Sequence, residues 1–197
     1  METNQLTELL LQSLEHEKGG VQVYETALKC AINAGLRAEW EKYLEETRRH
    51  VRVLTDLFGT LGLDLYQETP GRQVVRYLGS SLVQAMQMAL TSGAPEAAQL
   101  VACECVVLAE TKDHLDWELI GKCAAQLSGK QKEALDAAYS EIEDQEDEHL
   151  YHSKGWCREL WIESLGMRAI LPPPEEVAHV KTAKQAAEVE ERSARGR

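Results

Sequence analysis

Proline interrupts this chain at only three places: Pro70, Pro95 and the run from Pro172 to Pro174. Because proline breaks helices in their interior, the long stretches between these points are free to be helical. They are rich in Ala, Leu, Glu, Gln and Lys, which favour helix, and no stretch alternates apolar and polar residues with a period of two. The sequence therefore predicts an all-α protein.

Five helices are expected, over residues 3–34, 36–61, 70–90, 95–127 and 128–165. Gly35 and Gly62 are predicted to stop the first two helices, and Pro70 suits the first turn of the third. Ser128 with Gln131 three residues later has the pattern of a capping box. Four of these helices exceed 25 residues, and four long helices joined by short links usually form a bundle.

The predicted bundle spans residues 1–166, and the segment 62–94 crosses between its two helical hairpins. Beyond it, the prolines and a charged, Ala-rich end predict a C-terminal arm over residues 167–197 that is partly helical or disordered.

The charge of the chain limits its partners. There are 33 acidic and 21 basic residues, which gives a formal net charge of −12. Such a surface repels nucleic acid and anionic membranes, so neither is expected as a partner. No apolar run approaches the roughly 20 residues of a membrane span, and the N-terminus lacks a signal peptide. The five scattered cysteines show no disulfide or zinc framework, which favours a reducing cytoplasm.

Apolar residues recur at spacings of three and four along the four long helices, and this stripe becomes polar near the middle of the helices. Glu17, Glu110 and Glu146 occupy core positions there. A buried carboxylate without a partner costs several kcal/mol, and three together also repel one another. No Lys or Arg occupies these stripe positions, so the sequence predicts that a bound cation offsets the charge.

The other polar residues expected to point inward are His50, His114 and His149. Imidazoles are weak counter-ions but good metal ligands. Together with carboxylates on helices they suit iron or manganese, and zinc is also possible.

The two halves of the chain repeat one spacing. Glu17 is followed seven residues later by Tyr24, and Glu110 is followed seven residues later by Trp117. Each glutamate therefore has an aromatic residue on the same face of its helix, two turns away. Aromatic residues at such positions are most often simply part of the core.

The second part of each repeat ends in histidine. Thr47 and His50 are three residues apart, as are Glu146 and His149. A Glu-x-x-His pair places both ligands one helical turn apart, which is a suitable spacing for one metal ion.

This arrangement resembles the ferritin-like di-iron carboxylate superfamily, which includes rubrerythrins and bacterioferritins. In it, one helix of each pair gives a Glu and the other gives a Glu-x-x-His. The nearest likeness is to the YciE/YciF-like stress-associated ferritin-like proteins, and it is carried by the segment Leu44 to His50 (LEETRRH) and by the following residues to Gly62, which end in LFGTLG. The resemblance covers about residues 5 to 165. It implies a ferritin-like four-helix bundle with an extra short helix in the crossover.

The first half departs from the family pattern, because Thr47 stands where a Glu is expected and threonine is a poor ligand for iron. Glu46 is the nearest substitute, since it lies on roughly the same helix face as His50. If Glu46 turns inward, a site for two ions survives; if it does not, the site holds one ion or none. Asp113 or His114 offers a replacement ligand. The predicted metal ligands are Glu17, Glu46, His50, Glu110, Glu146 and His149.

Two functions remain open. The resemblance implies an iron or manganese protein with one or two ions per chain, which reacts with oxygen or peroxide in iron oxidation, peroxide removal or stress protection. A complete rubrerythrin is excluded, because the chain lacks the four-cysteine rubredoxin module. The alternative is a non-catalytic helical dimerisation or scaffold protein with a degenerate metal site. A homodimer is expected under either hypothesis.

Overall fold

The computed structural model describes residues 3–174, and within this range it contains α-helices and no β-strand. The all-α class predicted from the sequence is therefore confirmed. Residues 165–174 form no helix, and the rest of the predicted C-terminal arm, from residue 175 on, lies outside the described residues. The helices are α1 (Thr3–Cys30), α2 (Ala34–Leu61), α3 (Pro70–Thr91), α4 (Pro95–Ala124) and α5 (Gly129–Ser164).

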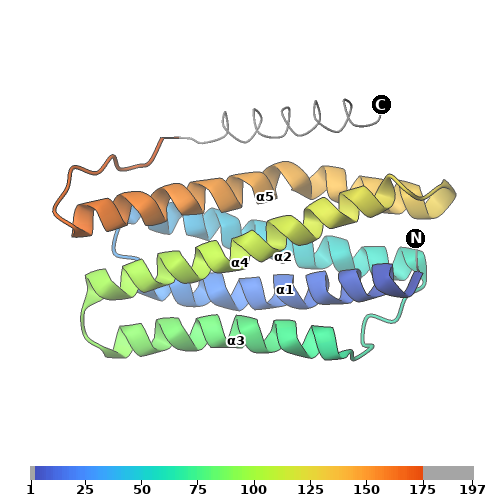
Figure 1. The fold of residues 1–197 in the computed structure, drawn as a ribbon, viewed down its shortest axis with the longest axis horizontal. Coiled ribbons are helices and arrows are strands. Elements are labelled where there is room, and N and C mark those ends of the chain that lie inside the picture. The colour runs from blue at the N-terminus through green and yellow to red at the C-terminus, as the bar shows by residue number, and fades with distance from the viewer. Residues whose placement is uncertain (1–2, 175–197) are drawn as a thin grey trace, which may run out of the picture.

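The five helices lie alongside one another (Figure 1). Helix α1 packs against α2 and α4, and α5 packs against the same two helices, so these four form a closed ring. Helix α3 lies on the outside of this ring, where it contacts α1 and α4. None of the helices in the described range has the length and apolar character needed to cross a membrane.

The turn between α1 and α2 differs from the prediction. Helix α1 ends at Cys30 rather than at Ala34, and Gly35 lies inside α2 instead of stopping α1. The stop predicted at Gly35 is wrong because Asn33 begins the next helix: its Oδ1 atom accepts hydrogen bonds from the backbone N–H groups of Gly35 and Leu36, 2.9 and 3.1 Å away. Asparagine is among the best residues for capping a helix N-terminus.

The other helix ends are closer to the prediction. Gly62 ends α2 in the left-handed conformation, with φ 67°. The Thr69 side chain caps α3, which begins at Pro70 as expected. The capping box predicted at Ser128 does not form, because its side chain makes no capping hydrogen bond. The next residue, Gly129, has a φ of 62°, so the chain does not start α5 in the geometry that a capping box requires.

The apolar core is divided into two clusters. One includes Trp40, Tyr43 and Trp156, near the α1–α2 turn. The other includes Leu10 and Phe58, toward the opposite end of the same helices. Along each of the four long helices, the polar stripe positions fall between these clusters. The inward-facing polar residues therefore form a layer across the middle of the molecule.

Helix α3 is fixed to the rest of the fold by a buried arginine. The guanidinium of Arg72 donates to Glu15 on α1, with 2.7 Å between Nε and Oε2, and to the carbonyl oxygens of Leu65 and Gln67 in the α2–α3 connection. Further along, α3 approaches α1 closely at Gly79, where an added Cβ atom would lie 3.6 Å from the Cα atom of Gly19 on α1. One face of α3 is thus firmly attached to α1.

Candidate metal centre

The three glutamates predicted at core positions are all buried. Glu17 on α1, Glu110 on α4 and Glu146 on α5 have exposed fractions of 0%, 3% and 1%. His50 on α2 and His149 on α5 are equally buried. The prediction that these side chains face the interior is confirmed, and it places carboxylates and imidazoles from four helices in the middle of the ring.

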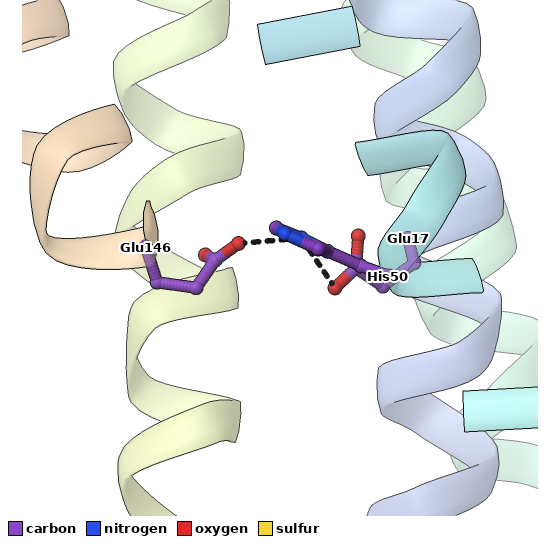
Figure 2. Close-up of side chains that lie close together, drawn as sticks. All are labelled: Glu17, His50 and Glu146. Atoms are coloured by element: carbon purple, nitrogen blue, oxygen red, sulfur yellow. Dashed lines mark ion pairs between the residues drawn. The ribbon is translucent and has the colours of Figure 1, made fainter. Parts of the chain in front are cut away.

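The first candidate ligand group consists of Glu17, His50 and Glu146, whose ligand atoms all lie within 4.8 Å of one another. Figure 2 shows the imidazole of His50 between the two carboxylates. Its Nδ1 atom is 2.9 Å from Oε1 of Glu146 and 3.4 Å from Oε1 of Glu17. Two carboxylates and one imidazole form a ligand set that iron, manganese and zinc accept.

The second candidate ligand group consists of Glu110, Glu146 and His149. The Nδ1 atom of His149 is 3.6 Å from Oε2 of Glu110 and 3.8 Å from Oε1 of Glu146. Glu146 belongs to both groups, so its carboxylate lies between the two positions. One residue can therefore contact two neighbouring ions.

The inner atoms of both groups lack hydrogen-bond partners. Although Nδ1 of His50 and Oε1 of Glu146 are close enough for an ion pair, they are not aligned as a hydrogen bond. A buried polar atom without a partner costs about 1–3 kcal/mol, more if it is charged. A cation between the groups would satisfy these atoms together. The unpartnered atoms are Oε2 of Glu17, Oε2 of Glu110, both oxygens of Glu146, and Nδ1 of His50 and of His149.

Both imidazoles are held from the other side. Nε2 of His50 is 2.8 Å from Oε1 of Gln145, and Nε2 of His149 is 2.9 Å from Oε2 of Glu46. Because each partner atom is an acceptor, Nε2 carries the proton, and in a neutral ring Nδ1 is left with a free lone pair. A histidine that binds a metal usually donates its other N–H in this way.

The Glu and aromatic residues that repeat in the two halves of the sequence contact one another across the halves. Tyr24 donates a hydrogen bond of 2.8 Å to Oε1 of Glu110, and Trp117 donates one of 2.8 Å to Oε1 of Glu17. The aromatic residue of each half therefore holds the glutamate of the other half. These contacts fix one oxygen of each carboxylate and leave the second oxygen, in both cases Oε2, without a partner.

Glu46 and Thr47 are both outside the two ligand groups. Glu46 approaches His149 from the outer side, and its side chain is 21% exposed. Thr47 is buried, but its hydroxyl donates to the backbone oxygen of Tyr43 at 2.8 Å. The structure thus brings five of the six predicted ligands into the two groups, and it places Glu46 behind one of them.

Of the two replacement ligands considered on α4, only Asp113 is buried. Its Oδ1 atom has no hydrogen-bond partner. Burial, followed by the charges of Glu146 and Glu17, raises the pKa of Asp113 well above its usual value. His114 instead contacts Asp147 at 2.8 Å, away from both groups. Asp113 is therefore a further buried carboxylate that lies close enough to feel the charges of the ligand groups, and it is the more suitable of the two replacement ligands.

Protons stabilise this interior in the absence of an ion. Burial lowers the pKa of His50, but the charges and close contacts of Glu17 and Glu146 outweigh it and raise the pKa to about 11. Burial also lowers the pKa of His149, but Glu110 and Glu46 raise it to about 9. The histidines were expected to be weak counter-ions, yet here two imidazolium charges offset the carboxylates.

Burial is also the largest cause of the raised pKa of Glu146, which reaches about 7; the nearby charges of Glu17 and Glu110 raise it further, while His50 lowers it. At neutral pH the site therefore retains protons that a metal ion would displace.

Sequence reasoning missed two residues that shape the site. The first is Gln145, which holds His50. It precedes Glu146 just as Glu46, which holds His149, precedes Thr47, so the internal repeat of the sequence could have identified it. The second is Tyr43, which no feature of the sequence marked as a site residue. Its ring centroid is 4.2 Å from that of His149, and its hydroxyl donates to Oε1 of Glu39 at 2.6 Å.

The chain matches no protein-family model, no curated protein and no solved structure. Function must therefore be inferred from the geometry of these buried groups.

Proposed function

We propose that this chain is a ferritin-like metalloprotein that binds two redox-active metal ions side by side. The ring of α1, α2, α4 and α5 would be its four-helix bundle, and α3 the extra helix of the crossover. One ion would lie between Glu17, His50 and Glu146, and the other between Glu110, His149 and the same Glu146 carboxylate.

One observation carries this proposal: the atoms of the two groups that could bind a metal lie close together and lack hydrogen-bond partners. Six buried oxygen and nitrogen atoms of these residues lack a hydrogen-bond partner, while every one of these side chains except Glu146 is held by a hydrogen bond at its other polar atom. Native proteins leave few buried polar atoms unsatisfied, and a bound ion is one of the usual reasons for such a cluster. The outer contacts orient the inner atoms, as the surroundings of a metal site do.

The ligand types favour iron or manganese. Carboxylates and imidazoles suit these ions, whereas thiolates, which favour copper(I) or iron–sulfur clusters, are not among the ligand groups. Each ion would have three ligands from the chain, which leaves coordination positions open. Iron or manganese bound there would give electrons to oxygen or peroxide, which supports a role in iron oxidation or peroxide removal.

The chain's own residues would assist this chemistry. The negative carboxylates stabilise the more highly charged oxidised ions. Tyr24 and Trp117 keep two of these carboxylates in place through hydrogen bonds. The two apolar clusters on either side exclude water from the layer, which strengthens every electrostatic contact within it.

Metal content and oxidation test the proposal together. The purified metal-free chain would be titrated anaerobically with Fe²⁺ or Mn²⁺ in a calorimeter, which gives the number of ions bound. It would then be exposed to oxygen or to hydrogen peroxide, and the consumption of the oxidant and the absorbance of ferric iron would be recorded. We expect two ions per chain and oxidation of bound Fe²⁺ faster than in buffer. The Glu110→Ala/Glu146→Ala double variant should show neither.

One observation favours a second candidate, a non-catalytic helical dimerisation or scaffold protein. The raised pKa values of His50 and His149 support it, because two imidazolium charges would offset the buried carboxylates without an ion. Under this alternative the chain binds no metal in the titration, and the double variant is at least as stable as the wild type, because inward charges have been removed.

A further inference from the structure

The outward face of α3 carries large apolar side chains that remain exposed in the described part of the chain. Val74, Tyr77, Leu78 and Met88 have exposed fractions of 57%, 71%, 50% and 72%. The opposite face of the same helix is already packed, and its Met86 is fully buried. A helix that is apolar on both faces is normally covered on both.

These side chains cannot reach the core by rotation of the helix. Arg72 ties the start of α3 to Glu15 and to two backbone carbonyl groups. The close approach of Gly79 to Gly19 fixes the helix again two turns later. The outward face is therefore a permanent feature of the fold and is held rigid before any partner binds.

This surface is also free of charge. From residue 77 to residue 94 the chain has no charged residue, although 27% of all its residues are charged. The exposed Arg76 precedes this stretch, and its charge is paired with Glu15 and Glu68. Depletion of charge with retention of aromatic residues and methionine is the compositional signature of a protein interface.

Two of the exposed apolar residues are placed symmetrically about Ser81. Val74 and Met88 are each seven residues, or two helical turns, from Ser81. In an antiparallel pair of α3 helices, Val74 would therefore face Met88 of the second copy. A two-fold interface requires such self-complementarity, in which each contact occurs twice.

We propose that α3 pairs with α3 of a second copy of this chain, antiparallel, about a two-fold axis beside Ser81. The small side chain of Ser81 allows the two helices to approach closely at the crossing point. Two copies that each carry a net charge of −12 repel one another, and the uncharged face of α3 is a surface on which they can meet without juxtaposing like charges.

The size of this contact predicts a weak dimer. The face from Val74 to Met88 is roughly 20 Å long, since an α-helix rises about 1.5 Å per residue. A contact of this length buries on the order of 500 Å² per copy, less than the roughly 800 Å² of a standard stable interface. We therefore expect a dissociation constant in the micromolar range.

Sedimentation of the full chain tests the proposal between about 1 and 200 µM, a range that brackets a micromolar dissociation constant. We expect a monomer–dimer equilibrium. The Val74→Glu/Met88→Glu variant should raise the dissociation constant at least tenfold, because it places carboxylates in the contact. Ile32→Glu, at an exposed apolar position in the α1–α2 turn, is the matched control and should change nothing. Circular dichroism verifies that each variant is folded.

A chain that stays monomeric throughout this range would overturn the proposal, as would equal effects of the two substitutions. A monomer would mean that a different protein, or residues of the same chain beyond 174, covers the face.

Cross-linking tests the register independently of stability. A disulfide requires Cβ atoms about 3.5–4.5 Å apart, which only residues beside the two-fold axis can satisfy. Under mild oxidation we expect Ser81→Cys to form a covalent dimer and Ser80→Cys to remain monomeric, with the wild type as control for the native cysteines. Cross-linking at both positions, or at neither, contradicts the antiparallel pairing about Ser81.

Discussion

His50 and Glu146 lie 2.9 Å apart, between Nδ1 and Oε1, without forming an aligned hydrogen bond. Both side chains are buried, and each is fixed by its own helix. The closeness of the two atoms stabilises a protonated imidazole when no ion is present. The lack of alignment leaves both atoms without a hydrogen-bond partner, so the same arrangement would also serve the metal-bound site that we propose.

The sharing of Glu146 predicts an unequal effect of single substitutions. Glu17→Gln removes a ligand from the first group only, and Glu110→Gln removes one from the second group only, so each variant should retain about one ion of two, because a neutral amide is a poor ligand. Glu146→Gln should lose both ions. Metal analysis after equilibrium dialysis measures this, with the exposed Glu133→Gln on the same helix as the control for loss of charge. If Glu146→Gln binds as much metal as the wild type, the shared-ligand arrangement is falsified.

The raised pKa values predict that the metal-free protein loses stability as the pH rises. The pKa of His149 is about 9 and that of His50 is about 11, both above the 6.5 of an unfolded histidine. Their contribution is fully present below pH 6.5, and it is lost progressively as the pH rises through these folded-state values. For His149 the loss is on the order of 3 kcal/mol. Thermal unfolding in a chelator should show Tm falling from pH 6.5 to pH 9.

Metal should remove this pH dependence. A bound ion keeps the imidazoles deprotonated at Nδ1, so the stability of the loaded protein should not decline over the same range, and metal affinity should increase with pH. A metal-free Tm that stays level between pH 6.5 and pH 9 would show that the histidines carry no charge in the folded state.

Glu46 should support a ligand without being one. Glu46→Gln removes the charge behind Nε2 of His149 but leaves an amide oxygen that can still accept its proton. Loss of such an outer contact typically lowers metal affinity by about 10–100-fold, with the number of ions unchanged. Calorimetric titration separates the two quantities. The neighbouring Glu45→Gln, with 69% of its side chain exposed, removes the same charge and should leave the affinity unchanged. Loss of a whole ion in Glu46→Gln would make Glu46 a direct ligand.

Thr47→Glu should couple stability to metal. The position is 2% exposed, so a further carboxylate there would destabilise the metal-free protein by several kcal/mol. Excess Fe²⁺ or Mn²⁺ should restore much of this stability, because an ion that binds only the folded state stabilises it. Urea unfolding with and without metal measures the difference. Thr47→Gln has a similar size without the charge, and we expect metal to have a smaller effect on it; equal rescue of both variants would argue against a role for the new carboxylate.

The attachment of α3 should depend on Arg72 far more than on Arg76. Arg72→Met removes the buried donor to Glu15 and leaves two backbone carbonyl groups without that donor, so it should lower the free energy of unfolding by about 2–4 kcal/mol. Arg76→Met removes the ion pairs to Glu15 and Glu68 of a half-exposed guanidinium, and it should cost less than about 1 kcal/mol. Urea denaturation of both variants compares them directly, and similar losses would show that the buried contacts add nothing beyond the exposed ones.

The helices and their inward faces were predictable because both follow from periodicity within one segment. Glu17, Glu110 and Glu146 are buried where the spacing of three and four places them. Helix ends were less predictable, since they depend on contacts between segments. The early end of α1, for example, is stabilised by Arg37 of α2, which donates to the carbonyl oxygen of Leu28.

The partners of the site residues were beyond the sequence for a related reason. Spacing shows which side chains share a face of one helix, but it does not give the register between helices. Spacing places Tyr24 on the same helix face as Glu17, yet the residue that it holds is Glu110 on α4. Glu46 was considered with His50 on the same helix, but its contact is His149 on α5.

The position of the polar layer between two apolar clusters has a consequence for how the molecule opens. Without an ion, each cluster can loosen while the other stays intact, because the residues between them are held largely by protons and water can hydrate them. Two ions that share Glu146 would join all four helices at mid-length, so opening at one end would then strain the other. Backbone amides at the two ends should exchange with deuterium independently in the metal-free chain and in concert in the loaded one.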